Sequence, residues 1–172
     1  MTRHIAWLRG VNLGKRQVRS ADLRQAFTDL GYDNVKTLLA SGNVLFDADI
    51  IDRHRIESGL EKAFGFPIPV VLRSQAQLQE TVGSDPFRGL AADKDTKFYV
   101  TFLADPVAKS LPMPCEVPGD FRVVHLTDTE IFIIAHRMPS GRFGAGMDQI
   151  HQFFGKQHLW TSRNWNTVLK AL

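Results

Sequence analysis

The sequence predicts an α+β protein of two parts. Strand and helix periodicities alternate over residues 1–74, whereas a hairpin pattern dominates the second half. With 172 residues, of which 44% are hydrophobic, the chain can bury a core as one domain or as two joined halves. The predicted elements of the first part follow the order β-α-β-β-α-β, which is the order of a ferredoxin-like domain. We therefore expect a ferredoxin-like subdomain at residues 1–74 and a second, smaller α+β subdomain with an antiparallel hairpin at residues 75–172.

The first strand is predicted at residues 3–9, where Ile5 and Trp7 share one face and the residues between them share the other. After a loop, Ser20 is expected to cap a helix whose apolar residues recur at helical spacing until Gly31. The remaining predicted elements are strands at 35–39 and 43–46, a helix at about 52–64 and a strand at 68–72.

A β-hairpin is the central predicted feature of the second part. Residues 121–126 and 131–136 flank a turn of sequence Thr-Asp-Thr-Glu, and the second of these strands is apolar on both faces, which indicates burial. In this hairpin His125 is expected to face Phe132. Other expected elements are a strand at 97–103, short helices at 74–82, 148–154 and 162–172, and a Pro-rich connection at 105–119.

Composition excludes several classes of protein. The chain has no run of about 18 apolar residues, so no transmembrane helix is predicted, and its N-terminal apolar run is too short for a signal peptide. The single cysteine, Cys115, cannot form an intramolecular disulfide and is typical of a reducing compartment. We therefore expect a cytoplasmic protein with no membrane partner, and the sequence leaves the oligomeric state open.

Positive charge is concentrated at both ends of the chain. Residues 1–24 contain six basic side chains and one acidic side chain, and residues 156–172 contain three basic side chains and no acidic one. The segment between them is net negative, and the whole chain carries +3. Basic ends attract a phosphate or a carboxylate, although ordinary solvated surface charge explains the same distribution.

Three polar clusters interrupt apolar surroundings. They are residues 9–15 (Arg-Gly-Val-Asn-Leu-Gly-Lys), 41–43 (Ser-Gly-Asn) and 161–167 (Thr-Ser-Arg-Asn-Trp-Asn-Thr). Glycine and asparagine tolerate backbone conformations that other residues avoid, and they present amide groups. Arginine and lysine donate hydrogen bonds to anions. The third cluster is expected at the start of the last helix, whose free N–H groups favour an anion. The candidate ligand-binding residues are Arg9, Asn12, Lys15, Ser41, Asn43, Arg163, Asn164 and Asn166.

The sequence gives less support to a phosphate-binding loop, a metal site, a catalytic centre or an RNA-binding surface. The Gly-rich segment 141–146 lacks the Lys-Ser/Thr ending of a Walker A loop, and the 6 histidines and single cysteine show no metal-binding spacing. We therefore predict no metal and no cofactor, and no known catalytic motif is complete. The third predicted strand, at 43–46, lacks the Lys/Arg-Gly-Phe pattern of RNA-recognition domains, so nucleic acid is a weaker alternative.

The three clusters also carry a family resemblance. Residues 7–14 (Trp-Leu-Arg-Gly-Val-Asn-Leu-Gly), 38–46 and 161–168 resemble those of the bacterial domain-of-unknown-function family 1697, and the match runs from end to end. The resemblance implies two α+β subdomains, the first ferredoxin-like, and it implies no particular reaction. It also associates a Ser-Lys pair with the end of the Gly-rich stretch, where this chain has Gly144-Ala145-Gly146-Met147.

The sequence therefore leaves four functional hypotheses. The first is a binding module for a small anionic or nucleotide-like ligand, and the second is an enzyme of unrecognised type that acts on such a ligand. The third is a nucleic-acid-binding protein. In the fourth hypothesis the clusters have only a structural role and hold the loops between the two halves in place, because buried asparagine and arginine side chains often hydrogen-bond to backbone groups.

Overall fold

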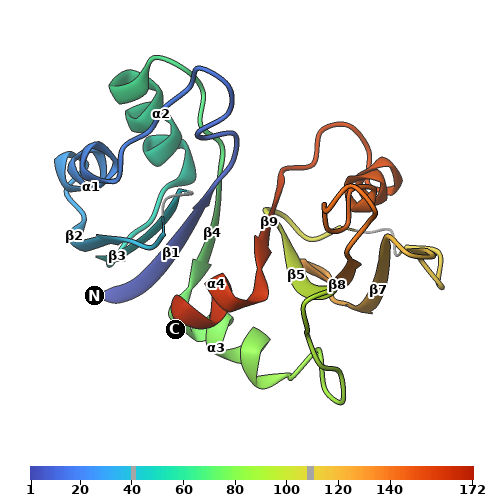
Figure 1. Ribbon diagram of the computed structural model, residues 1–172. Coiled ribbons are helices and arrows are strands. Elements are labelled where there is room, and N and C mark those ends of the chain that lie inside the picture. Colours follow the sequence, from blue (N-terminus) through green and yellow to red (C-terminus); the bar gives the residue numbers. More distant parts are fainter. Residues whose placement is uncertain (40–41, 108–110) are drawn as a thin grey trace. The chain divides into compact units, whose positions relative to one another are not determined.

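The computed structural model describes residues 1–39, 42–107 and 111–172, and it is a mixed α+β structure with two antiparallel sheets (Figure 1). The chain forms two compact units, unit 1 (Met1–Glu80 with Lys170–Leu172) and unit 2 (Thr81–Leu169). Unit 2 is thus not the smaller of the two, and the division lies a few residues after the expected boundary at 74.

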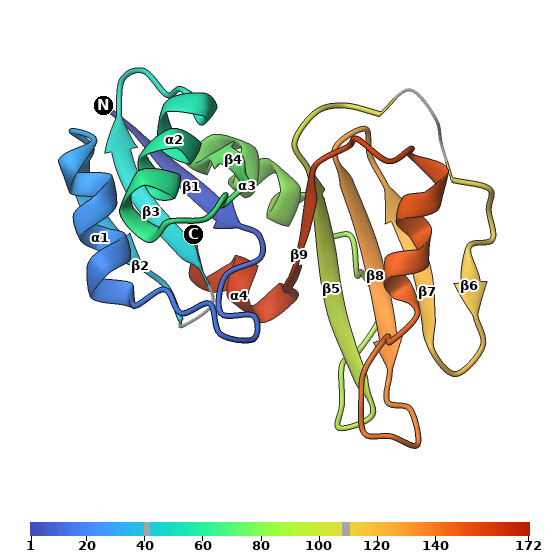
Figure 2. The ribbon, with the colours of Figure 1, turned by 90° about the horizontal axis from the view of Figure 1, so that it is seen from above.

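The sheet of unit 1 has the strand order β2-β3-β1-β4. Its strands are β1 (Thr2–Leu8), β2 (Asp33–Thr37), β3 (Asn43–Ala48) and β4 (Val70–Ser74), and all neighbours pair antiparallel. The helices α1 (Ser20–Asp29) and α2 (Arg53–Phe64) lie on one face of this sheet (Figure 2). Ala6 and Leu8 of β1 join the core beneath these helices, together with Phe27, Phe46 and Leu60.

Helix ends in unit 1 follow local side-chain chemistry. The Asp52 carboxylate accepts a hydrogen bond from the Arg55 N–H at 3.2 Å and so caps α2. The helix α3 (Gln75–Gly83) begins with a capping box, in which Ser74 Oγ accepts from the Gln77 N–H and Gln77 Oε1 accepts from the Ser74 N–H. The expected cap at Ser20 is wrong, because Ser20 is already the first helical residue.

The sheet of unit 2 has the order β6-β7-β8-β5-β9. Its strands are β5 (Thr96–Leu103), β6 (Glu116–Val117), β7 (Phe121–Leu126), β8 (Glu130–His136) and β9 (Trp160–Asn164). The strands β7 and β8 form the predicted hairpin, β8 is buried along most of its length, and His125 faces Phe132 as expected. The 3₁₀ helix η1 (Met147–Phe153) stands in place of the helix expected at 148–154 and lies over β7 and β8 (Figure 2).

Two expectations for unit 2 are wrong. The Pro-rich connection contains the short strand β6, which pairs with β7. The helix expected at 162–172 is divided between strand β9 and the short helix α4 (Trp165–Lys170). Without β9, the strand β5 would lie at the edge of the sheet with unpaired backbone groups. Residues 160–164 pair with these groups as a strand, which explains why they do not join the helix. Among the described residues, no helix is both long and apolar enough to cross a membrane.

Candidate functional site

The loop between β1 and α1 has an unusual backbone. Gly10, Asn12 and Gly14 adopt positive φ angles of 73°, 56° and 58°, whereas Val11 and Leu13 between them do not. Successive residues on alternating sides of the φ map are typical of backbone concavities in which several N–H groups face one anion. We call residues 10–19, which include these five, the basic loop.

Hydrogen bonds within the basic loop fix its shape. Asn12 Oδ1 accepts from the Val18 N–H at 2.9 Å, and the Arg16 N–H donates to the Leu13 carbonyl at 3.0 Å. Val18 is buried, so its amide needs a protein partner, and the Asn12 side chain supplies one. These two hydrogen bonds therefore constrain the backbone of the loop.

The side chains of the basic loop make it electropositive. Lys15, Arg16 and Arg19 are exposed, Arg9 before the loop is half-buried, and residues 9–19 include no acidic residue. The Arg16 guanidinium carbon lies 4.8 Å from the centre of the Phe66 ring, a cation–π contact that orients the side chain. A depression of about 540 Å³ is lined by Asn12, Gly14, Arg16, Gln17, Val18, Arg19 and Ser20.

The turn between β2 and β3 packs directly against this loop. The Leu8 N–H donates to the Gly42 carbonyl at 2.9 Å. Gly42 has a φ of 74°, and a Cβ placed there would lie 2.7 Å from Val11 Cγ2 and 3.0 Å from Leu8 Cβ. The first and second polar clusters are therefore neighbours in unit 1, and only glycine allows their close approach. Ser41 lies outside the described residues.

Asn43 serves the turn itself. Its side chain is fully buried, and its Nδ2 donates to the Leu38 carbonyl at 2.9 Å. The Leu38 N–H in turn donates to the Asn43 carbonyl at 2.9 Å. These contacts assign Asn43 a role in positioning the turn beside the basic loop.

The third cluster lies in unit 2 and has its own hydrogen bonds. Arg163 Nη1 donates to Thr161 Oγ1 at 2.6 Å and to the Ser162 carbonyl at 2.8 Å. Burial lowers the pKa of Arg163 to about 10, so the guanidinium is still a cation at neutral pH. Asn164 Oδ1 accepts from the Asn166 N–H at 2.9 Å and caps α4, while the Asn166 side chain is exposed.

The expected position of the third cluster at the start of the last helix is wrong. The helix α4 begins at Trp165 and has only 6 residues, so Thr161 and Arg163 belong to a strand rather than to a helix N-terminus. The hydroxyl groups of Thr101 and Ser162 lie 2.6 Å apart between β5 and β9, which ties this segment to the sheet.

The Gly-rich segment 141–146 binds a side chain of the protein, the carboxylate of Asp120. Both carboxylate oxygens of Asp120 accept from the Gly146 N–H, at 2.9 and 3.2 Å. A Cβ at Gly146 would collide with Asp120 Oδ2, which explains the glycine at this position. This internal contact gives the segment a structural role and adds no support to the phosphate-loop alternative.

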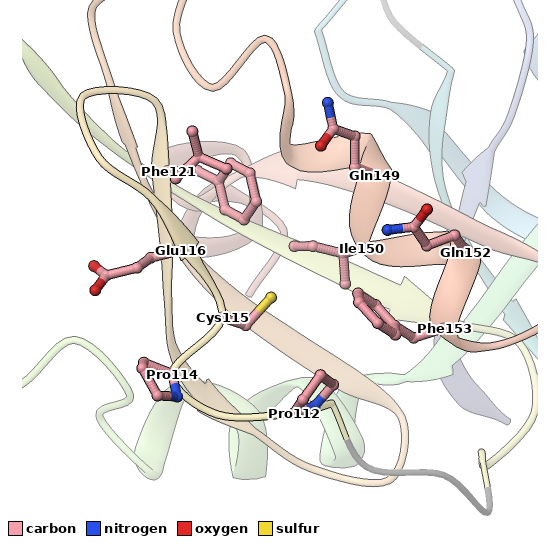
Figure 3. Close-up of a pocket in the computed structure, with 10 residues that line it drawn as sticks. Pro112, Pro114, Cys115, Glu116, Phe121, Gln149, Ile150, Gln152 and Phe153 are labelled. Atoms are coloured by element: carbon pink, nitrogen blue, oxygen red, sulfur yellow. The ribbon is translucent and has the colours of Figure 1, made fainter.

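A separate pocket of about 230 Å³ lies in unit 2 between η1 and the segment around β6 (Figure 3). Cys115, Ile150 and Phe153 face a common space there, whereas Glu116 points away from it (Figure 3). Burial raises the pKa of the Cys115 thiol, so the nucleophilic thiolate is disfavoured at neutral pH. The remaining lining residues are Pro112, Pro114, Val117, Phe121, Gln149 and Gln152.

The basic loop is thus the candidate site that the geometry supports most strongly. The loop retains Asn12 and Lys15 from the sequence prediction, with Arg9 directly before it, and it adds Arg16 and Arg19. The sequence signal for these two arginines was the absence of acidic residues from segment 9–19. In the described part of the chain, no three histidine, cysteine or acidic side chains gather as a metal site.

These features define a class, namely a two-unit α+β protein with a glycine-rich basic loop after its first strand. A family model described as "Protein of unknown function (DUF1697)" matches residues 1–132. The chain therefore belongs to the DUF1697 family, which confirms the family predicted from sequence; the match includes the first two polar clusters, and the third lies beyond it.

A solved structure gives the same fold. It is described as the structure of conserved bacterial protein SP0830 from Streptococcus pneumoniae, and it matches with a TM-score of 0.66 and 22% sequence identity. The alignment covers 99% of this chain and 96% of the other chain. No curated protein matches the chain.

Proposed function

We propose that the protein binds a small anionic or nucleotide-like ligand at the basic loop of a ferredoxin-like unit 1. The observation that carries the proposal is the alternating φ of residues 10–14, immediately before Lys15 and Arg16. Backbone N–H groups in a conformation typical of anion sites and the cations of Lys15 and Arg16 then lie on one short stretch of chain, a combination that favours phosphate.

Each neighbouring residue supports this arrangement in a different way. Asn12 closes the loop on Val18, and Gly42 and Asn43 hold the adjoining turn against its base. Lys15 is a flexible, strongly hydrated cation, whereas Arg16 is held against Phe66. In the proposed complex, Arg16 orients the anion and Lys15 closes over it.

The surroundings of the loop favour a compact ligand over an extended polyanion. The adjacent helix α1 carries two acidic side chains, Asp22 and Asp29, against one basic side chain, Arg24. Both aspartates line a second depression, together with Gln25, Ala26, Ala63 and Phe64. Negative side chains on this helix would repel a nucleic-acid backbone that continued past the basic loop. A single phosphate or pyrophosphate group fits within the basic stretch.

Isothermal titration of the purified protein with inorganic pyrophosphate and with ATP tests the proposal. We expect both to bind, and the double variant Lys15→Ala/Arg16→Ala to weaken binding by at least about tenfold, or about 1.4 kcal/mol. The matched control is Lys62→Ala, which removes an exposed cation from α2 and should leave affinity within about twofold of wild type. Failure of the wild-type protein to bind either anion, or equal loss in the control, would overturn the proposal.

A further inference from the structure

Two imidazole rings meet in unit 2, whereas the basic loop belongs to unit 1. His151 Nδ1, in η1, lies 3.0 Å from His158 Nε2, which is in the segment that leads to β9. Both side chains are partly exposed, so the pair is accessible from solvent. Neither ring has a role in the proposed anion site.

The protonation of His158 follows from its other contact. His158 Nδ1 lies 2.9 Å from the Gly155 carbonyl oxygen, which can only accept, so Nδ1 carries a proton. In the neutral ring the lone pair is therefore on Nε2, the atom that faces His151. A histidine whose distal N–H is held by a backbone carbonyl is the usual arrangement for a metal ligand, because the carbonyl fixes both tautomer and ring direction.

The ring of His151 is fixed by stacking. It lies 3.5 Å from the Trp160 ring between centroids, with an angle of 7° between the planes. Phe154 packs edge-on against His158, at 5.3 Å between ring centres. Aromatic contacts therefore limit the movement of both imidazoles, so the two facing nitrogens stay close together.

We propose that His151 Nδ1 and His158 Nε2 together bind a divalent transition-metal ion, with Cu²⁺ preferred. Metal–nitrogen bonds of about 2.0–2.1 Å at a right angle place their two nitrogens about 2.9 Å apart. The observed 3.0 Å matches this spacing, which is that of neighbouring positions in tetragonal coordination by Cu²⁺ or Ni²⁺. Water completes the coordination. On binding, the Nδ1 proton of His151 is lost from that atom and Nε2 becomes the protonated nitrogen of the ring, so the neutral pair releases no net proton.

Metal binding at this pair has a structural consequence. The ion links η1 to the residue two positions before β9 and so closes the intervening segment 152–157 as a chelate loop. Because the site forms only in the folded protein, the ion stabilises the fold by mass action.

Titration of untagged protein with CuSO₄, followed by calorimetry and by electron paramagnetic resonance, tests the proposal. We expect one site with hyperfine coupling to two imidazole nitrogens, and at least tenfold weaker affinity in His151→Asn and in His158→Asn. The matched control is His54→Asn, which removes an exposed histidine from α2 and should leave this site unchanged. Wild-type affinity no higher than that of the double variant His151→Asn/His158→Asn would overturn the proposal.

Imidazole ¹H–¹⁵N spectra of the wild-type protein with ZnCl₂ give a second readout that needs no variant. We expect the ring signals of His151 and His158 to shift together at one equivalent of Zn²⁺, and those of His54 and His125 to stay in place. Equal shifts at all four rings, or none, would show that the pair shares only a proton.

Discussion

Asn12 sets the conformation of the basic loop by two properties of one side chain. Asparagine tolerates the left-handed φ of 56° better than other residues with a Cβ, and its Oδ1 accepts from the buried Val18 N–H. This contact joins the start of the loop to its end and so helps to position the amides and cations around Asn12. We therefore expect Asn12 to position the loop rather than to contact the ligand.

We predict that Asn12→Ala lowers the free energy of unfolding by about 1–3 kcal/mol, since it strands the Val18 amide and strains the backbone. Asn12→Gly is the matched control, because glycine keeps the left-handed conformation and removes only the hydrogen bond, so its loss should be smaller. Urea denaturation of the three proteins measures both effects. Wild-type stability in both variants would contradict the role assigned to Asn12.

Asp47 links β3 to two other parts of unit 1. Its carboxylate accepts from Asn34 Nδ2 at 2.7 Å and from Arg3 Nη1 at 3.0 Å. The hydrogen bond from Asn34, then that from Arg3, lowers the pKa of Asp47 below its ordinary value. A lowered folded-state pKa means that the stabilisation is present above the unfolded-state pKa and is lost as pH falls through the folded-state pKa.

We therefore predict that wild type is more stable than Asp47→Asn at neutral pH, and that this difference shrinks once the pH falls below about 3.9, the ordinary aspartate value. Thermal unfolding of both proteins between neutral and acidic pH measures the difference. A gap that stays constant down to the lowest pH would show that the contacts of Asp47 do not depend on its charge.

At the scale of elements, the junction between the basic loop and the β2–β3 turn depends on Gly42. Gly10 provides a matched comparison, since its φ of 73° is nearly the same but a Cβ there would meet nothing within 4 Å. The two glycines thus share nearly the same φ and differ in the space available for a Cβ.

We predict that Gly10→Ala costs about 1–2 kcal/mol from backbone strain alone, and that Gly42→Ala costs a further 1–3 kcal/mol, roughly, from the collision with Val11 and Leu8. Chemical denaturation of the two variants separates the contributions. Equal destabilisation would mean that the turn can move away from the loop at no cost.

The elements that could be predicted from sequence are those with strong periodicity and clear ends. The helix α2 has regularly spaced apolar residues, an Asp52 cap and Gly65 at its end, where φ is 81°. The end of the chain offered no such signal. Residues 162–164 fall within the predicted last helix because Arg163 shares a helical spacing with Asn166, Thr167 and Lys170, but pairing with β5 decides their conformation.

The candidate site was predictable only in part for a related reason. Glycine, asparagine and basic residues marked the loop after β1, and the absence of acidic residues marked its charge. Sequence alone did not indicate that Asn43 bonds to Leu38, or that Arg16 rests on Phe66, since these contacts depend on three-dimensional packing. Three of the four asparagines that looked like ligand contacts, Asn12, Asn43 and Asn164, thus bond to the backbone.

At the scale of the whole molecule, the uneven distribution of charge distinguishes the two binding hypotheses. An extended phosphate-contacting surface would give affinity for single-stranded RNA or DNA that falls with salt, with a log–log slope near −0.7 per phosphate neutralised. We predict instead weak oligonucleotide binding at physiological salt that Lys15→Glu/Arg16→Glu leaves unchanged. Fluorescence anisotropy over a range of salt concentrations measures this. Submicromolar, salt-dependent affinity that the double reversal abolishes would favour nucleic acid as the ligand.

The central claim is that backbone amides of the basic loop bind an anion. Titration of ¹⁵N-labelled protein with inorganic pyrophosphate, followed by amide chemical shifts, tests it most directly. We predict saturable shifts concentrated at Gly10 through Arg16, with small changes in the amides of unit 2. Saturable shifts located elsewhere, or no shift in the loop at concentrations that saturate calorimetric binding, would contradict the account.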